Sequence, residues 1–164
     1  AQAVVFSGTS PRRAARCARA LADAGFTGPR LGTWHIMRPA FLQEAGPAAQ
    51  GWLFGTPFTD PGSVSPAFVS AHRAAHGTAP GRWAPEAYDA VGLVARALES
   101  LGSPADSAPG AVAQRLFGLT YRGLAKTLRF ESAHALVLKA NPVYFLYEAK
   151  DGAFRFLGRY DRIG

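Results

Sequence analysis

The chain has 164 residues, of which 48% are hydrophobic and 12% aromatic, which is enough apolar material for one globular domain. No apolar run approaches the roughly 20 residues that cross a bilayer, and no basic stretch followed by an apolar run opens the sequence. The net charge of +7 would favour a nucleic-acid or anionic-membrane partner only if the basic groups clustered. Apart from Arg12, Arg13, Arg16 and Arg19 the arginines are dispersed, so we predict no nucleic-acid partner.

The first predicted unit is a strand, a loop and a helix. Residues 3–6 (AVVF) predict a short buried strand, and the abrupt start before it leads us to expect a natural N-terminal part ahead of this sequence. Ser10 is a helix N-cap residue directly before Pro11, and Gly25 marks the end of the helix. Cys17, the single cysteine, falls on the apolar side of this helix and is expected to be a small core residue.

Strands and helices continue to alternate in the next segment. A second strand around Leu31 is followed by the aromatic loop 32–35 and a brief helix at 41–44. Residues 51–56 (GWLFGT) predict a third strand between glycine and proline, and a helix that closes at 76–77 follows. Because strands and helices alternate, we expect these strands to form a parallel sheet.

Residues 84–101 form the longest helical pattern of the sequence. Pro85 suits the first turn of a helix, and the Glu86 carboxylate favours its positive end. Gly102 then provides a stop. Apolar residues recur at spacings of three and four and predict one buried stripe, made of Tyr88, Val91, Ala95 and Leu98.

In the remainder of the chain, the spacing of the apolar residues changes from a helical to a strand-like pattern. Residues 103–109 predict a flexible connection, and residues 112–117 a further helix. Asp151-Gly152 predicts a hairpin turn between two of the strand-like segments, which are 127–130, 143–147 and 154–157. The expected fold class is therefore α/β, a three-layer and mostly parallel sheet with flanking helices that ends in antiparallel strands.

Eight local signatures stand in a fixed order along the chain: VVFSG, AGF, LGTW, GWLFGTPF, AFVSAHRAAHG, PEAYDAVGLVARAL, LTYRGLAKTLRFE and YEAKDGAF. Together they resemble the type I periplasmic binding proteins, and more narrowly the C-terminal portion of the substrate-binding proteins of branched-chain amino-acid (leucine, isoleucine and valine) ABC transporters. The resemblance implies that 1–164 is a single α/β ligand-binding lobe and that the N-terminal lobe of the family is absent. Its parts would be second-lobe βα units at 1–58, crossing helices at 59–102, and a helix with the terminal strands at 103–164.

The resemblance also implies a ligand cleft, and open parallel sheets bind ligands beyond the carboxyl ends of their strands. We predict ligand contacts from Thr9 and Ser10 after the first strand and from Trp34 and His35 after the second. Tyr88 matches a family segment near the hinge between lobes and is the fifth predicted residue. Structural roles remain open for three of these: loop packing for Trp34, a structural or exposed position for His35, and a core or hinge position for Tyr88.

Family members often carry an acidic residue where this sequence has Trp34, and no carboxylate stands there. A buried ammonium without a counter-charge is costly, so this departure disfavours a free amino acid. Trp34 suits an apolar, aromatic or cationic ligand instead.

We predict no catalytic residue, no metal and no cofactor. Cys17 and His35 are disfavoured as a nucleophile and its base, because an apolar helix face lacks the electropositive setting that activates a thiol. His72 and His76 have a spacing that can bind a metal, but without a third ligand a solvated helix face is the preferred interpretation. The loop SGTSP is too short for a phosphate-binding fingerprint.

The resemblance implies a non-catalytic solute-binding domain that lies in the periplasm or outside the cell, with a membrane anchor in a part outside this sequence as an option. An amino acid or related small molecule would close a clamp and present a new surface to an ABC permease or a fused upstream domain. Two alternatives stay open. One is a ligand-sensing or homodimerising module of a larger receptor such as a membrane kinase, and the other is a small hydrolase-like enzyme, for which no nucleophile and base are located.

Overall fold

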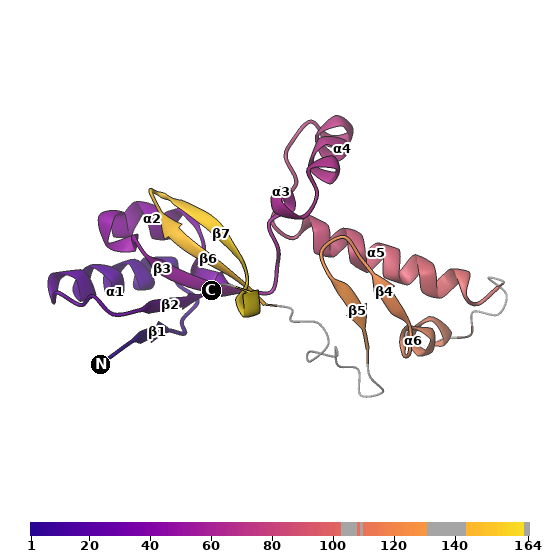
Figure 1. Ribbon diagram of the computed structural model, residues 1–164, viewed down its shortest axis with the longest axis horizontal. Coiled ribbons are helices and arrows are strands. Elements are labelled where there is room, and N and C mark those ends of the chain that lie inside the picture. Colours follow the sequence, from indigo (N-terminus) through magenta and orange to yellow (C-terminus); the bar gives the residue numbers. More distant parts are fainter. Residues whose placement is uncertain (103–107, 109, 131–143, 163–164) are drawn as a thin grey trace. The chain divides into compact units, whose positions relative to one another are not determined.

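The computed structural model describes residues 1–102, 108, 110–130 and 144–162, and the chain forms two compact units (Figure 1). Unit 1 consists of Ala1–Pro57 with Tyr144–Gly164, and unit 2 of Phe58–Val143. Most of the connection predicted at 103–109 and the first residue of the strand predicted at 143–147 lie outside the described residues. No helix within the described ranges has both the length and the apolar character needed to cross a bilayer.

Unit 1 is built on a mixed sheet with the strand order β1-β2-β3-β6-β7. The first three strands run parallel, whereas β6 is antiparallel to β3 and β7 is antiparallel to β6. The predicted α/β class and the predicted antiparallel strands at the end of the chain are thus confirmed. The strands are β1 (Val4–Phe6), β2 (Arg30–Thr33), β3 (Trp52–Thr56), β6 (Phe145–Lys150) and β7 (Ala153–Arg159).

The first helix of unit 1 begins at the residue that the sequence predicts, whereas the second begins at Pro39, two residues before its predicted start. Ser10 caps α1 (Pro11–Asp23) and accepts a hydrogen bond from the Arg13 backbone N–H at 3.3 Å. Gly25 follows α1 with a φ of +67°, a conformation that glycine adopts without a steric penalty. The other helical segments are α2 (Pro39–Ala45) and the 3₁₀ turns η1 (Trp34–Ile36), η2 (Gly46–Ala49) and η4 (Tyr160–Arg162).

Aromatic side chains form the core of unit 1. Phe41 of α2 makes edge-to-face contacts with Trp52 and Phe54 of β3, at ring-centroid distances of 5.6 Å in both cases, and all three side chains are fully buried. Phe154 of β7 packs edge-on against Phe54 at 5.3 Å. Burial of rings of this size supplies much of the free energy of folding.

Two burial predictions for unit 1 are wrong. β1 is an edge strand with one neighbour, β2, and therefore Val5 is 69% exposed where a buried strand was expected. Cys17 is only partly buried, because the buried face of α1 consists of Ala14, Ala15 and Ala18.

The predicted hairpin between β6 and β7 is confirmed. Asp151 and Gly152 both have positive φ, 51° and 74°, as the two central residues of a type I′ turn require. The Gln50 side chain accepts a hydrogen bond from the Asp151 backbone N–H at 3.0 Å and ties the turn to the start of β3.

Unit 2 is mainly helical and carries a separate two-stranded antiparallel sheet, β4-β5. Asp60 and Ser65 cap its first two helices with their side-chain oxygens. Neither α3 nor β4 is predicted from the sequence, because both elements are too short for a periodic pattern. The elements are α3 (Pro61–Val64), α4 (Pro66–His76), α5 (Ala84–Glu99), α6 (Ala111–Leu116), β4 (Thr120–Arg122) and β5 (Thr127–Arg129).

The buried face of α5 differs from the predicted stripe. Tyr88 and Val91 are 58% and 72% exposed, and Ala95 and Leu98 are exposed as well. The helix instead buries a face of residues four apart, namely Pro85, Asp89, Leu93 and Ala97. The apolar pattern therefore predicts the helix correctly and its core face incorrectly, because the core face includes a carboxylate.

Candidate ligand-binding site

The carboxyl ends of β1, β2 and β3 lie at one edge of the unit 1 sheet, because these strands are parallel. Phe6 pairs with Gly32, and Thr33 pairs with Gly55, so the three strands end at nearly the same position along the sheet. We define the strand-end edge as the residues that finish or follow these strands, which are Ser7–Ser10, Thr33–His35 and Thr56. It contains four of the five predicted site residues.

A hydrogen bond joins the loops that carry these residues. The Thr33 hydroxyl donates to the Gly8 carbonyl at 3.2 Å, so the loop after β1 is held against the end of β2. Ser10 and Trp34 are half-buried within these segments, whereas Thr9 and His35 are exposed. The structure therefore brings the two predicted loops together at one edge.

Trp34 and His35 form a stacked pair at the end of β2. Their ring centroids are 3.8 Å apart and their planes are inclined by 25°. Both residues belong to η1, a tight turn whose buried member is Ile36. A stacked indole and imidazole at a partly exposed edge offer a flat surface for an apolar or aromatic group and ring nitrogens that can hydrogen-bond to a polar one.

The strand-end edge contains hydroxyl groups and no carboxylate among its residues. The first turn of α1 has no acidic side chain, and it presents backbone N–H groups and the positive end of the helix dipole. Arg12 pairs with Glu44 at 3.0 Å, but the 79% exposed Arg12 side chain makes this ion pair weak. The edge therefore offers hydrogen-bond donors and an aromatic surface, and no counter-charge for an ammonium.

Tyr88, the fifth predicted residue, belongs to unit 2. It lies on α5, and its ring contacts Phe68 of α4 edge-on at 5.5 Å. With more than half of its surface exposed, it is not a core residue, and that alternative for Tyr88 is wrong. A ligand contact by Tyr88 stays a prediction.

Sequence reasoning missed a buried carboxylate anchor in unit 2. Asp89 of α5 accepts backbone hydrogen bonds from three consecutive residues of the β4-β5 turn: Leu124 at 2.5 Å, Ala125 at 2.8 Å and Lys126 at 3.3 Å. A Cβ at Gly123 would clash with this carboxylate, so glycine is required there by close approach. An acid one residue after Tyr88 and a glycine before the turn were the available signals, but neither specifies the pairing.

Glu86 lies one turn before Asp89 and forms a second anchor. One of its carboxylate oxygens accepts from the backbone N–H and the hydroxyl of Thr59, at 2.8 and 3.2 Å. The Lys126 ammonium lies 3.6 Å from the same oxygen, and the two side chains are only 13% and 12% exposed. Burial lowers the pKa of Lys126 below its usual value, while the charges of Glu86 and Asp89 oppose that shift. These contacts join separate segments of unit 2, so we assign them a structural role.

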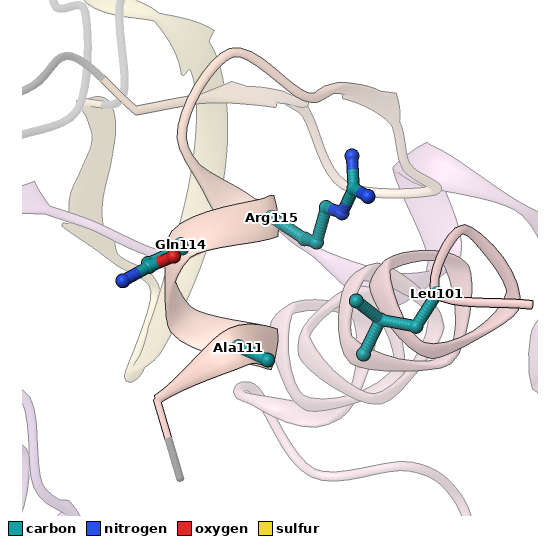
Figure 2. Close-up of a pocket in the computed structure, with 4 residues that line it drawn as sticks. All are labelled: Leu101, Ala111, Gln114 and Arg115. Atoms are coloured by element: carbon teal, nitrogen blue, oxygen red, sulfur yellow. The ribbon is translucent and has the colours of Figure 1, made fainter. Parts of the chain in front are cut away.

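A depression of about 570 Å³ opens beside α6 in unit 2 (Figure 2). It contains none of the predicted site residues and no buried charged group. Its lining residues are Leu101, Ala111, Gln114 and Arg115. Within the described part of the chain, no group of three or more His, Cys, Asp or Glu side chains is placed to hold a metal ion.

Solved structures share the fold over part of their length. An ABC transporter substrate-binding protein from Desulfitobacterium hafniense, in complex with Leu, is 28% identical, with a TM-score of 0.64 over 87% of this chain and 39% of that one. A leucine binding protein from Thermotoga maritima is 20% identical, with a TM-score of 0.70 over 98% and 45%. A solute binding protein from R. palustris, in complex with benzoate, is 22% identical, with a TM-score of 0.60 over 96% and 42%.

The chain therefore spans less than half the length of these three proteins. A comparison with curated proteins finds no match. The model of the family described as periplasmic binding protein matches residues 1–153, which is most of the sequence. The chain belongs to the periplasmic binding protein family.

Proposed function

We propose that this chain is the solute-binding portion of an extracytoplasmic binding protein of an ABC transporter, and that it binds a small molecule at the strand-end edge without catalysing a reaction. The observation that carries the proposal is the Thr33 to Gly8 hydrogen bond, which holds the loops with Ser10 and Trp34 at one edge of a parallel sheet. Such edges are where open α/β sheets bind ligands. Membership of the family and the substrate-binding proteins among its structural neighbours support the same role.

The ligand class follows from the groups at this edge. We propose an amino acid or a related small molecule, since the similar protein from Desulfitobacterium hafniense is in complex with Leu. The edge supplies hydroxyls and the positive end of α1 for an anionic group, and the Trp34 ring for an apolar group. The edge supplies no carboxylate to pair with an ammonium group. Within this class of ligand we therefore expect apolar or aromatic carboxylates to bind more tightly than free amino acids.

Calorimetric titration of the chain with L-leucine, benzoate and choline tests this proposal. We expect saturable binding of at least one probe, with the carboxylates ahead of choline. Trp34→Ala should weaken binding about tenfold or more and leave the melting temperature nearly unchanged, because the side chain lies at a partly exposed edge. Trp34→Phe is the matched control and should retain most of the affinity. Equal loss of affinity and stability in Trp34→Ala would make Trp34 a packing residue and contradict the proposal.

The cellular setting belongs to the same proposal. We place the protein in the periplasm or outside the cell, with an ABC permease or a fused domain as its partner, as its family relationship supports. Cys17, the single cysteine, lies partly buried on α1, a setting that does not activate a thiol. Conversion of a bound probe, followed by mass spectrometry, would contradict the non-catalytic role.

A second candidate function is a dimerising module of a larger receptor, and one observation favours it. The outer face of α5 exposes a row of apolar side chains, which are Tyr88, Val91, Val94 and Leu98. Contiguous apolar surface of this kind commonly marks an interaction site. Analytical ultracentrifugation would detect a dimer that Val91→Glu dissociates and that Ala20→Glu, at an exposed position of α1, does not. A monomer at all concentrations would exclude this candidate.

A further inference from the structure

The C-terminal half of α4 carries a pair of histidines that the proposed function does not use. His72 and His76 are four residues apart on a helix of eleven residues, so their side chains project from the same face. Their ring centroids are 4.6 Å apart, and the ring planes are inclined by 54°. His76 is exposed and His72 is partly exposed, so both are accessible to an ion from solvent.

The position of one ring is fixed by the backbone. The Nδ1 atom of His72 lies 3.0 Å from the Thr78 carbonyl oxygen, which can only accept a hydrogen bond. Neutral His72 therefore carries its proton on Nδ1 and presents the Nε2 lone pair. Gly77, with a φ of +72°, reverses the chain after α4 and makes this contact possible. Metal-binding histidines characteristically donate their second ring N–H to a carbonyl or carboxylate in this way.

The surroundings also favour a cation. His76 lies in the last turn of α4, where unpaired carbonyl groups form the negative end of the helix dipole, and His72 lies one turn before it. Phe68 packs one turn before His72 at a ring-centroid distance of 6.2 Å and restricts its rotamers. Arg73 is the nearest positive side chain of the helix, but it is exposed and screened by solvent.

We propose that His72 and His76 form a two-ligand site for a divalent transition-metal ion, with Nε2 of His72 and one ring nitrogen of His76 as ligands. Nitrogens bound to one tetrahedral Zn²⁺ lie about 3.4 Å apart, a separation that rings 4.6 Å apart reach by small side-chain rotations. Water or a donor from another molecule completes the coordination. Imidazole ligands select Cu²⁺ and Zn²⁺ over Mg²⁺ and Ca²⁺, and Cu²⁺ binds most tightly in the usual order of affinities.

This site was not preferred from the sequence, because spacing alone shows neither the tautomer nor the distance between the rings. The contact with Thr78 and the 4.6 Å separation of the rings change that interpretation. The proposal is independent of solute binding, since it uses no residue of the strand-end edge. A bound ion would link α4 to the water or to the donor of another molecule that completes the coordination of the ion.

Calorimetric titration with ZnCl₂ and CuCl₂ at pH 7.5 tests the site, with MgCl₂ as the control ion. We expect one ion per chain, and a loss of affinity of about tenfold or more in both His72→Ala and His76→Ala, because each variant removes one of two ligands. His35→Ala is the matched control, an exposed imidazole in unit 1 that should leave the affinity unchanged. Since both ligands lie at the surface, the variants should retain the circular dichroism spectrum of the parent chain.

Three results would overturn the proposal. The first is an unchanged Zn²⁺ affinity in the double variant His72→Ala/His76→Ala, and the second is no saturable binding by the parent chain. The third is a ¹⁵N NMR spectrum of neutral His72 with the proton on Nε2, which would leave the wrong nitrogen available. The spectrum detects the tautomer without added metal, so it tests the geometry separately from the titration.

Discussion

The two units of this chain are stabilised by different kinds of contact. Unit 1 has a core of interlocking aromatic rings around Phe41, Trp52 and Phe54, all fully buried. The longest helix of unit 2 buries Asp89 and leaves Val91 on its outer face. Unit 1 thus depends mainly on apolar burial, whereas unit 2 depends strongly on two carboxylates that bind separate segments to α5.

The largest expected effect is the loss of a core ring from unit 1. Phe54→Ala removes a fully buried side chain that contacts Phe41 and Phe154, and should lower the free energy of unfolding by about 3 to 5 kcal/mol. Val5→Ala, at an exposed edge-strand position, should cost less than about 1 kcal/mol. Urea denaturation followed by circular dichroism measures both, and similar losses would mean that this aromatic cluster is not the core.

The next largest loss of stability is expected when the Asp89 carboxylate, which anchors the β4-β5 turn of unit 2, is removed. Asp89→Ala leaves three backbone N–H groups of the β4-β5 turn without their acceptor, and should cost about 2 to 4 kcal/mol. Val91→Ala, two residues along the same helix and exposed, should change stability by less than about 0.5 kcal/mol. Amide hydrogen exchange should show faster exchange at Leu124 and Ala125 in the Asp89 variant. Unchanged exchange there would argue against the anchor.

A smaller effect is expected at the start of α1. Ser10→Ala removes the acceptor for the Arg13 N–H and should destabilise unit 1 by about 1 kcal/mol, while Ser10→Asp should preserve the cap. If Ser10 also contacts the ligand, Ser10→Asp will retain stability and still weaken the binding of a carboxylate probe. Calorimetry and thermal unfolding of the two variants separate these roles, and a stable Ser10→Ala variant would show that the cap contributes little.

The smallest predicted effect is a pH dependence that arises from Lys126. Burial lowers its folded-state pKa below 10.5, so between the lowered pKa and 10.5 the unfolded chain binds more protons than the folded chain. Stability contributed by this group therefore rises with pH across that window and is constant below it. Lys126→Met should abolish this rise in urea denaturation experiments between about pH 7 and 10.5. The same alkaline rise in both proteins would assign it to another group.

Much of unit 1 could be predicted from the sequence, because its signals are local. Ser10-Pro11 marks the start of α1, Asp151-Gly152 has the conformation of the predicted turn, and alternation of strands and helices predicts parallel β1, β2 and β3. The same alternation places Ser10 and Trp34 after neighbouring strands, which the Thr33 hydrogen bond to Gly8 confirms. Their contact with a ligand stays a prediction.

Unit 2 was harder to predict for physical reasons. Apolar periodicity assumes that carboxylates face water, and Asp89 violates this because backbone N–H groups of a distant turn satisfy it. The outer face of α5 then carries Val91, which the same assumption places in the core. The pairing of Glu86 with Lys126 joins residues far apart in sequence, and no local pattern encodes it.

The strand-end edge of unit 1 is the place where we propose that a solute binds. Two-dimensional ¹H–¹⁵N NMR spectra of the chain, recorded during titration with benzoate and with L-leucine, test it most directly. We expect the largest chemical-shift changes on Ser7–Ser10 and Thr33–His35, which the Thr33 to Gly8 hydrogen bond holds together. Changes concentrated instead at the depression lined by Ala111 and Arg115, or no saturable change with either probe, would contradict it.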